Sequence, residues 1–119
     1  MTTLSRKPMS ATTLTGDDIK NEKDETLGSV EDIMIDCSTG RVAYVVMSAG
    51  GFLGLGEKFF ALPISVLNLD SENKCFRTDI DKEAFKNAEG FDKNDWPDMA
   101  SPDWEEINHK KFNAKPYWQ

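Results

Sequence analysis

The stretch SAGGFLGLGEKFFALP, residues 48–63, decides how this chain folds. Its four glycines fall within seven residues, as in a loop that cradles phosphate or in the turn of a β-hairpin. A dinucleotide-binding loop needs G-x-G-x-x-G leading into a helix, so that backbone N–H groups meet the phosphates. Here Gly51, Gly54 and Gly56 give the reverse spacing, and the following EKFFALP has the pattern of a strand. We therefore predict a hairpin, whose glycines permit left-handed and closely packed backbone.

Large apolar residues occupy this turn, namely Phe52, Leu53 and Leu55. A hairpin tip that faces water is usually polar, so these side chains require another explanation. Either the loop folds back over one end of the sheet, or it offers an apolar contact to a partner. The sequence leaves both alternatives open.

Short strands are expected on both sides of this hairpin. The six predicted strands are residues 18–21, 27–37, 41–48, 58–65, 67–69 and 75–78. Val30 is out of phase with Ile33 and Ile35, which indicates an irregularity near Asp32, such as a bulge. The segment DCSTGR, with Gly40, has the residues of a tight turn, so the second and third strands should be antiparallel neighbours.

The strand at residues 41–48 is almost continuously apolar, and its side chains alternate between the two faces of a sheet. Such a strand is covered on both faces. This favours either a small closed barrel or a sheet with something packed on its back. Pro63 cannot donate to a strand ladder and indicates an edge or a bend. The spacing of the strands indicates an all-β barrel or sandwich.

The pattern becomes helical after these strands. Asp81 is a suitable N-cap for a helix of about two turns, Gly90 is placed to end it, and Ile80 can pack on Phe85 across the cap. The pair Ser101 and Pro102 predicts a second helix start. The apolar stripe predicted for that second helix is Trp104, Ile107 and Phe112.

The carboxyl-terminal segment also carries all three tryptophans, which are Trp96, Trp104 and Trp118. Aromatic residues at this density usually pack against other apolar surface. They cover either the chain's own barrel or a second copy of it, and the sequence does not decide between the two.

Composition excludes several functions. With 14 basic and 21 acidic side chains the net charge is −7, which disfavours binding to nucleic acid. The longest apolar runs are too short for a bilayer span, and the amino-terminal segment lacks the apolar block of a secretory signal, so we expect a cytoplasmic protein. Cys37 and Cys75 are too few for a disulfide scaffold and are expected to be buried free thiols.

The sequence contains no recognisable catalytic constellation. His109 is the only histidine, and beside Lys110 and Lys111 it is expected to be solvated. No second histidine or nearby cysteine could complete a metal site or a catalytic triad. The segment DKNDWPD, from Asp92, lacks the ligand and the glycine that a calcium loop requires at its fifth and sixth positions. We predict no catalytic, cofactor-binding or metal-binding residue, no cofactor, and no enzyme activity.

The segment LGSVEDIMIDCSTGRVAYVVMSAGGFLGLGEKFFALPISVL, residues 27–67, closely resembles the PRC-barrel family. The likeness continues through DKEAFKNAEGF, residues 81–91, although Glu89 stands where many relatives have proline. It implies an all-β, small six-stranded barrel with a short helix and, in this chain, a helical extension. The expected division is a flexible segment at 1–13, a PRC-barrel domain at 14–91 and a tryptophan-rich extension at 92–119.

The resemblance also implies a function. Known members include the cytoplasmic domain of the photosynthetic reaction centre H subunit and a domain of a ribosome-maturation factor, and both hold partners. We expect a non-enzymatic protein–protein interaction module; the alternative is a small-molecule or quinone-proximal binding protein. Exposed apolar residues favour a homodimer, with an unidentified further protein partner. The expected contact residues are Phe52, Leu53, Leu55, Trp96, Trp104 and Trp118. Deletion from Ser101 is expected to split the dimer.

Overall fold

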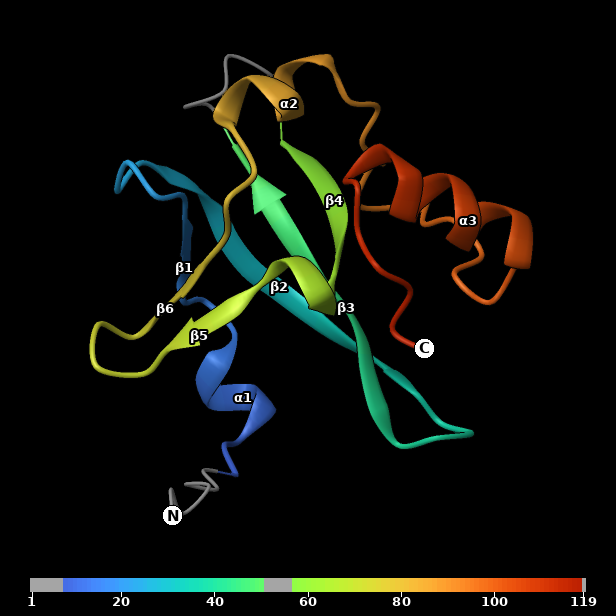
Figure 1. Ribbon diagram of the computed structural model, residues 1–119, viewed down its shortest axis with the longest axis horizontal. Helices are drawn as coiled ribbons and strands as arrows, with labels where there is room; N and C mark the ends of the chain where they lie inside the picture. The colour runs from blue at the N-terminus through green and yellow to red at the C-terminus, as the bar shows by residue number, and fades with distance from the viewer. Residues whose placement is uncertain (1–7, 51–56, 119) are drawn as a thin grey trace.

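The computed structural model describes residues 8–50 and 57–118. It contains a six-stranded sheet with the order β4-β3-β2-β1-β6-β5 (Figure 1). The strands are β1 (Asp18–Lys20), β2 (Thr26–Asp36), β3 (Arg41–Ala49), β4 (Lys58–Pro63), β5 (Asn68–Asp70) and β6 (Cys75–Arg77). The helices are α1 (Ala11–Leu14), η2 (Ile64–Val66), α2 (Lys82–Asn87) and α3 (Pro102–Lys111). All six predicted strands are confirmed, and β1 and β6 form the parallel pair of the sheet.

The predicted hairpin around the glycine cluster is confirmed by the strands that flank it. β3 and β4 pair antiparallel, with Ala49 opposite Lys58 and Val46 opposite Ala61. Because Lys58 begins a strand, no helix follows the glycines as a phosphate-binding loop would require. The apolar residues of the turn, Phe52, Leu53 and Leu55, lie outside the described residues.

The sheet curls but does not close, so the predicted closed barrel is not confirmed. β4 and β5 end the strand order, and no pairing joins them in the described part of the chain. Pro63 ends β4. The 3-10 turn η2 then redirects the chain before β5 begins (Figure 1). Because Pro63 has no N–H and η2 follows at once, β4 is not continued towards β5.

The β2–β3 hairpin has the irregularity and the turn that its sequence predicts. The register shifts between Val30 and Asp32, as expected for a bulge. In the turn, Gly40 has φ +76° and donates its N–H to the carbonyl of Asp36 at 2.7 Å. The Asp36 carboxylate accepts hydrogen bonds from the backbone and the hydroxyl of Ser38.

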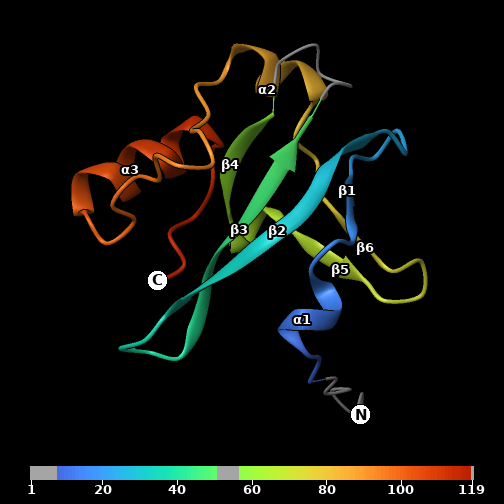
Figure 2. The ribbon, with the colours of Figure 1, turned by 180° about the vertical axis from the view of Figure 1, so that it is seen from behind.

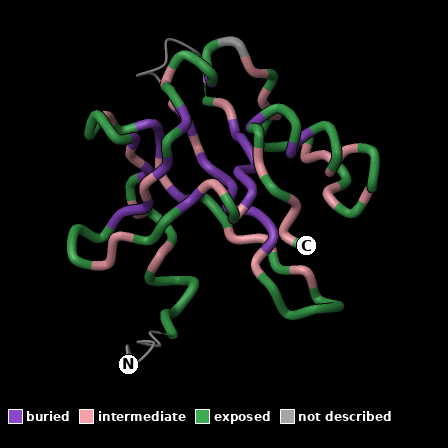
Figure 3. The backbone as a smooth tube through the Cα atoms, viewed as in Figure 1, coloured by how far each residue is buried: buried purple, intermediate pink, exposed green. Residues whose placement is uncertain are grey.

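The core has two parts, and residues of β3 contribute to both. Ala43 to Met47 are all buried. Figure 3 shows in purple that the buried stretches of the backbone gather in the middle of the molecule. The inner cluster includes Phe60, Phe85 and Phe112, with ring centroids 5.2 Å apart for Phe60–Phe85 and 5.8 Å for Phe85–Phe112. The outer cluster is centred on Tyr44. Of the two alternatives for this strand, the structure has the sheet with a second layer on its back.

The predicted cap of α2 is confirmed, but its predicted stop is not. The Asp81 carboxylate accepts from the N–H of Glu83, and Ile80 and Phe85 share the inner cluster. The helix ends before Gly90, with Ala88 as its C-cap. Gly90 instead allows the chain after α2 to approach β4 closely, because a Cβ at this position would lie 2.8 Å from the carbonyl oxygen of Phe59.

Candidate interaction surface

Two of the three tryptophans cover the chain's own sheet. The Trp96 ring lies 5.9 Å from Phe59 and 5.3 Å from Phe91, and Trp104 lies 5.3 Å from Tyr44. Trp118 is 47% exposed. Its ring makes an edge-to-face contact with the His109 imidazole, with the ring centroids 5.1 Å apart. Three of the contact residues predicted from the sequence lie in the described part of the chain, and of these only Trp118 is exposed.

The predicted apolar stripe of α3 is wrong at Ile107, and the prediction for His109 is wrong as well. Ile107 is 63% exposed, whereas Asn108 and His109 are buried on the side of the helix that faces the sheet. His109 Nδ1 donates to the carbonyl of Glu105 at 2.7 Å, and its Nε2 is buried without a partner among the described residues. The aromatic rings packed on the imidazole exclude water from it; these rings are Tyr44, Tyr117 and Trp118.

The outer edge of β4 is covered by Phe91 and by α3 of the carboxyl-terminal extension. Phe59 and Phe91 exchange two backbone hydrogen bonds of 2.9 Å, and Asn108 Nδ2 donates to the carbonyl of Ala61 at 2.8 Å. Pro63, at the end of the strand, has no N–H to offer. An unprotected edge strand is a template for pairing with another chain. Phe91 and α3 therefore close this edge to a partner.

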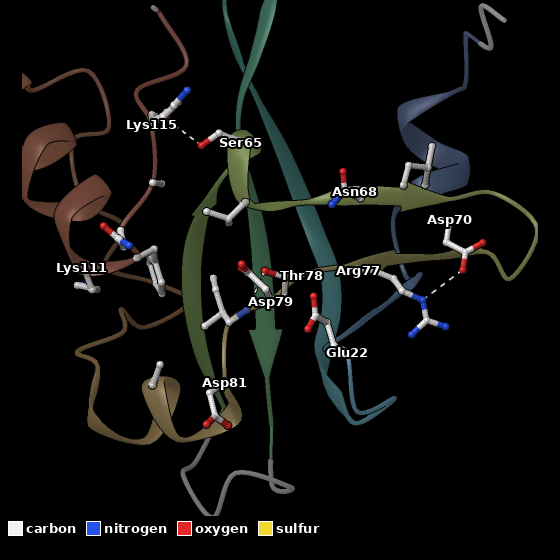
Figure 4. A pocket seen from close by; sticks show the side chains of 17 residues that line it. Glu22, Ser65, Asn68, Asp70, Arg77, Thr78, Asp79, Asp81, Lys111 and Lys115 are labelled. Carbon is white, nitrogen blue, oxygen red and sulfur yellow. Dashed lines mark hydrogen bonds and ion pairs between the residues drawn. The ribbon is translucent and has the colours of Figure 1, made fainter.

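The other end of the sheet carries a groove of about 960 Å³, beside the short edge strand β5 (Figure 4). Leu69 of β5 lines the groove and is 41% exposed. One side of the groove is formed by the β5–β6 hairpin and the start of α2. The other side is formed by the segment that follows α3. We call it the seam groove, because it lies where a closed barrel would join its two end strands.

Charges of opposite sign line the two sides of the seam groove. Glu22, Asp79 and Asp81 lie on one side, and Lys111 and Lys115 lie on the other (Figure 4). In the described part of the chain, Glu22 and Asp79 form no ion pair. These carboxylates and the Lys115 ammonium are available to a partner.

Arg77 fixes the geometry at the β5 end of the groove. Its guanidinium contacts Asp24 at 2.9 Å and Asp70 at 3.2 Å. The hydrogen bond from Arg77 lowers the pKa of Asp24, and hydrogen bonds from Asn73, followed by Arg77, lower the pKa of Asp70. Both carboxylates therefore stay ionised at neutral pH. They hold β6 against β5 and against the β1–β2 turn.

Two tyrosine–carboxylate hydrogen bonds connect the carboxyl-terminal extension to strands β2 and β3. The Tyr44 hydroxyl donates to Glu105 at 2.8 Å, and the Tyr117 hydroxyl donates to Asp36 at 3.2 Å. Burial raises the pKa of Tyr44 well above its usual range, and the bond to Glu105 adds to this effect. Burial, together with the charge of Glu105, raises the pKa of Tyr117 to about 12.

These raised pKa values predict a loss of stability at alkaline pH. A phenol whose pKa is higher in the folded state contributes stability below the unfolded pKa of about 10, and this contribution is lost as the pH rises through the folded value. Between pH 10 and 12 the unfolding free energy of wild type should therefore fall more steeply than that of Tyr117→Phe. Urea unfolding of both proteins across this range measures the difference. Parallel pH profiles for wild type and Tyr117→Phe would refute the prediction. The two proteins have the same lysines and thiols, so these groups do not contribute to the difference.

The remaining titratable groups of the described residues form no cluster that could hold a metal ion. Within residues 8–50 and 57–118, no three His, Cys, Asp or Glu side chains converge to hold a metal ion. Both cysteines are free thiols, as predicted. Cys75 is buried, but the prediction for Cys37 is wrong: it lies exposed in the β2–β3 turn, because β2 ends one residue before it.

The seam groove was missed by sequence reasoning. Its lining comes from four separate stretches of the chain, and no local pattern marks residues such as Glu22 and Lys115 as neighbours. The one usable signal was β5 itself, a very short strand next to a polar turn. As for membranes, α3 is the longest helix described, and neither it nor any other described helix is long and apolar enough to cross a bilayer.

Comparisons with known proteins identify the family of this chain. No curated protein sequence gives a significant match. Among 27 matching chains of solved structures is a protein assigned to 16S ribosomal RNA processing, RimM of Pseudomonas aeruginosa. It is 16% identical, with a TM-score of 0.47, and the match covers 63% of this chain but only 45% of RimM. The sequence model of the PRC-barrel domain matches residues 8–85, well over half of the chain. The chain therefore belongs to the PRC-barrel domain family.

Proposed function

We propose that this chain is a non-enzymatic interaction module whose docking surface is the seam groove, and that a second copy of the chain binds there. The observation that carries the proposal is the contrast between the two ends of the sheet. The β4 edge is covered by Phe91 and Asn108, whereas β5 borders an open groove with an exposed Leu69. The matches give no support to the alternative of a quinone-proximal binding protein.

An edge strand beside a groove is a common site of protein recognition. An extended segment can pair with the backbone of the edge strand, while pockets beside the edge accept its side chains. β5 is paired on one side only, with β6. Leu69 adds an apolar contact, and burying it would remove one of the larger exposed apolar side chains of the protein.

The charge distribution of the groove favours a second copy as the partner. In a two-fold symmetric interface each surface meets its own copy, so residue i contacts j and j contacts i. A surface that is acidic throughout would repel itself. The seam groove, with Asp79 and Glu22 facing Lys111 and Lys115, can match acids to lysines twice under a two-fold rotation.

Charge exchange on the two sides tests this arrangement. Reversing the acidic side (Glu22→Lys with Asp79→Lys) should weaken dimerisation at least tenfold, because several exposed pairs of up to about 1 kcal/mol each turn repulsive. Reversing the lysine side (Lys111→Glu with Lys115→Glu) should have a similar effect. Combining all four changes restores complementarity and should return the dimer constant to within about threefold of wild type. Light scattering across micromolar concentrations measures the constant.

Glu31→Lys is the matched control, since Glu31 is exposed on β2 and does not line the groove. It should leave dimerisation unchanged. A wild-type protein that is monomeric at every concentration would refute the homodimer. A dimer that is indifferent to reversal of either side would show that the contact lies elsewhere, and would refute the role of the seam groove.

A further inference from the structure

A second groove, of about 550 Å³, lies on another part of the molecule. It runs between the β2–β3 hairpin and the segment that leads into α3, with Tyr117 of the carboxyl-terminal segment at its side. Figures 1 and 2 both show the end of the chain passing between α3 and this hairpin. The groove shares no lining residue with the seam groove. We call it the hairpin groove.

Every charged side chain that lines the hairpin groove is a carboxylate. The three are Asp36, Asp98 and Glu105. None of them is in an ion pair with another described residue. Arg41, close by on the hairpin, directs its guanidinium to the carbonyl of Tyr117 at 3.3 Å instead.

Neighbouring hydroxyls fix two of these carboxylates, Asp36 and Glu105, without neutralising them. Tyr44 donates to Glu105, while Tyr117 and Ser38 donate to Asp36. The hydrogen bonds from Ser38 are the main reason that the pKa of Asp36 is lowered, so it is ionised at neutral pH. Both phenols keep their protons there, because their pKa values are raised. The groove is therefore anionic over the physiological pH range.

The rest of the lining is largely apolar and aromatic. Trp96 and Tyr117 are partly exposed within it, and Pro97 and Met99 complete the side formed by the segment before α3. An ammonium group near a Trp or Tyr ring is attracted by the negative face of the ring. Pockets of roughly 300–1,000 Å³ with apolar linings and a few polar groups are typical of small-molecule sites.

We infer that the hairpin groove binds a small organic cation, an ammonium group carried on an apolar body, with Asp36 and Glu105 as its counter-charges and Trp96 and Tyr117 as its aromatic contacts. A chelated metal ion fits less well, because within the described residues no three carboxylates converge on one point. An organic cation spreads its charge over a larger volume and needs no such convergence. The inference does not depend on the proposed dimer, since the two grooves are separate.

Calorimetric titration with choline and n-butylammonium, against 3,3-dimethylbutan-1-ol as the uncharged isostere of choline, tests the site. The cations should bind and the alcohol should not, at an ionic strength held constant with sodium chloride. Glu105→Gln and Asp36→Asn remove the charge and keep one of the two acceptor oxygens. Each should weaken cation binding about tenfold, as expected when one close charge partner is lost.

Glu106→Gln is the matched control, because it removes the same charge one position further along α3, outside the groove. It should change binding less than twofold. Equal binding of choline and its isostere, or no cation binding up to millimolar concentration, would overturn the inference. So would affinities unchanged by Glu105→Gln and Asp36→Asn. Binding of a lysine-containing peptide without binding of the free cations would assign the groove to a protein partner and reject the small ligand.

Discussion

Deletion of residues 101–119 is expected to abolish the cooperative unfolding transition of the protein. The deleted segment covers Tyr44 and Ala61, which are 1% and 2% exposed, and it contains Phe112 of the inner cluster. Loss of one buried phenylalanine costs about 3–5 kcal/mol. A domain has a total stability of about 5–15 kcal/mol. We therefore expect the deletion to unfold the sheet. The prediction that it separates a dimer into folded subunits stays a prediction.

A pair of point variants tests the same prediction within the intact chain. Phe112→Ala should lower the free energy of unfolding by about 3–5 kcal/mol, because it opens a cavity beside Phe85. Ile107→Ala, on the exposed side of the same helix, should change it by less than about 0.5 kcal/mol. Urea unfolding followed by circular dichroism measures both. A truncated chain with the melting curve of wild type would show that the extension is dispensable.

Local chemistry was sufficient to predict the strands and most of the turns. The tight turn before β3 depends on Asp36 and Gly40, which lie within five residues of each other, and the bulge follows from the phase of Val30. The cap of α2 depends on Asp81 and on the backbone two residues later. Such features require no knowledge of distant parts of the chain, so the sequence alone reveals them.

The position of α3 could not be predicted in this way. Hydrophobicity favours Ile107 as the buried residue, whereas the structure buries Asn108 and His109. Asn108 is buried because the β4 edge leaves the carbonyl of Ala61 without a strand partner, and the side-chain amide satisfies it. The reason lies 47 residues away in the sequence, and a periodicity analysis of the helix does not include it.

The two candidate sites were hidden for the same reason. Glu105 and Asp36 flank one groove although they come from α3 and from the end of β2. Asp79 and Lys115 flank the other. The tryptophans were a correct signal that the extension packs on something, and Trp96 and Trp104 pack on the chain's own sheet. The contacts predicted for Phe52, Leu53 and Leu55 lie outside the described residues and stay predictions.

Gly28→Ala is expected to be among the most destabilising single-methyl changes in the sheet. Gly28 is buried in β2, opposite Ile19 of β1. A Cβ at this position would lie 2.4 Å from the carbonyl oxygen of Ser48 and 2.6 Å from Cγ of Met47. The methionine can change its rotamer, but the carbonyl moves only if β3 moves. We expect a loss of about 2–3 kcal/mol, the upper part of the range for overpacked cores.

Gly50→Ala separates this steric effect from the general effect of replacing glycine. Replacing glycine by alanine stabilises a protein by about 0.4–1 kcal/mol where the native backbone permits it, because the unfolded chain loses freedom. At Gly50 no described residue lies within 4 Å of the added Cβ, and its φ is outside the left-handed region. Gly50→Ala should therefore be neutral or slightly stabilising, opposite in sign to Gly28→Ala. Equal unfolding free energies for the two variants would mean that β2 and β3 do not approach each other closely at Gly28 in solution.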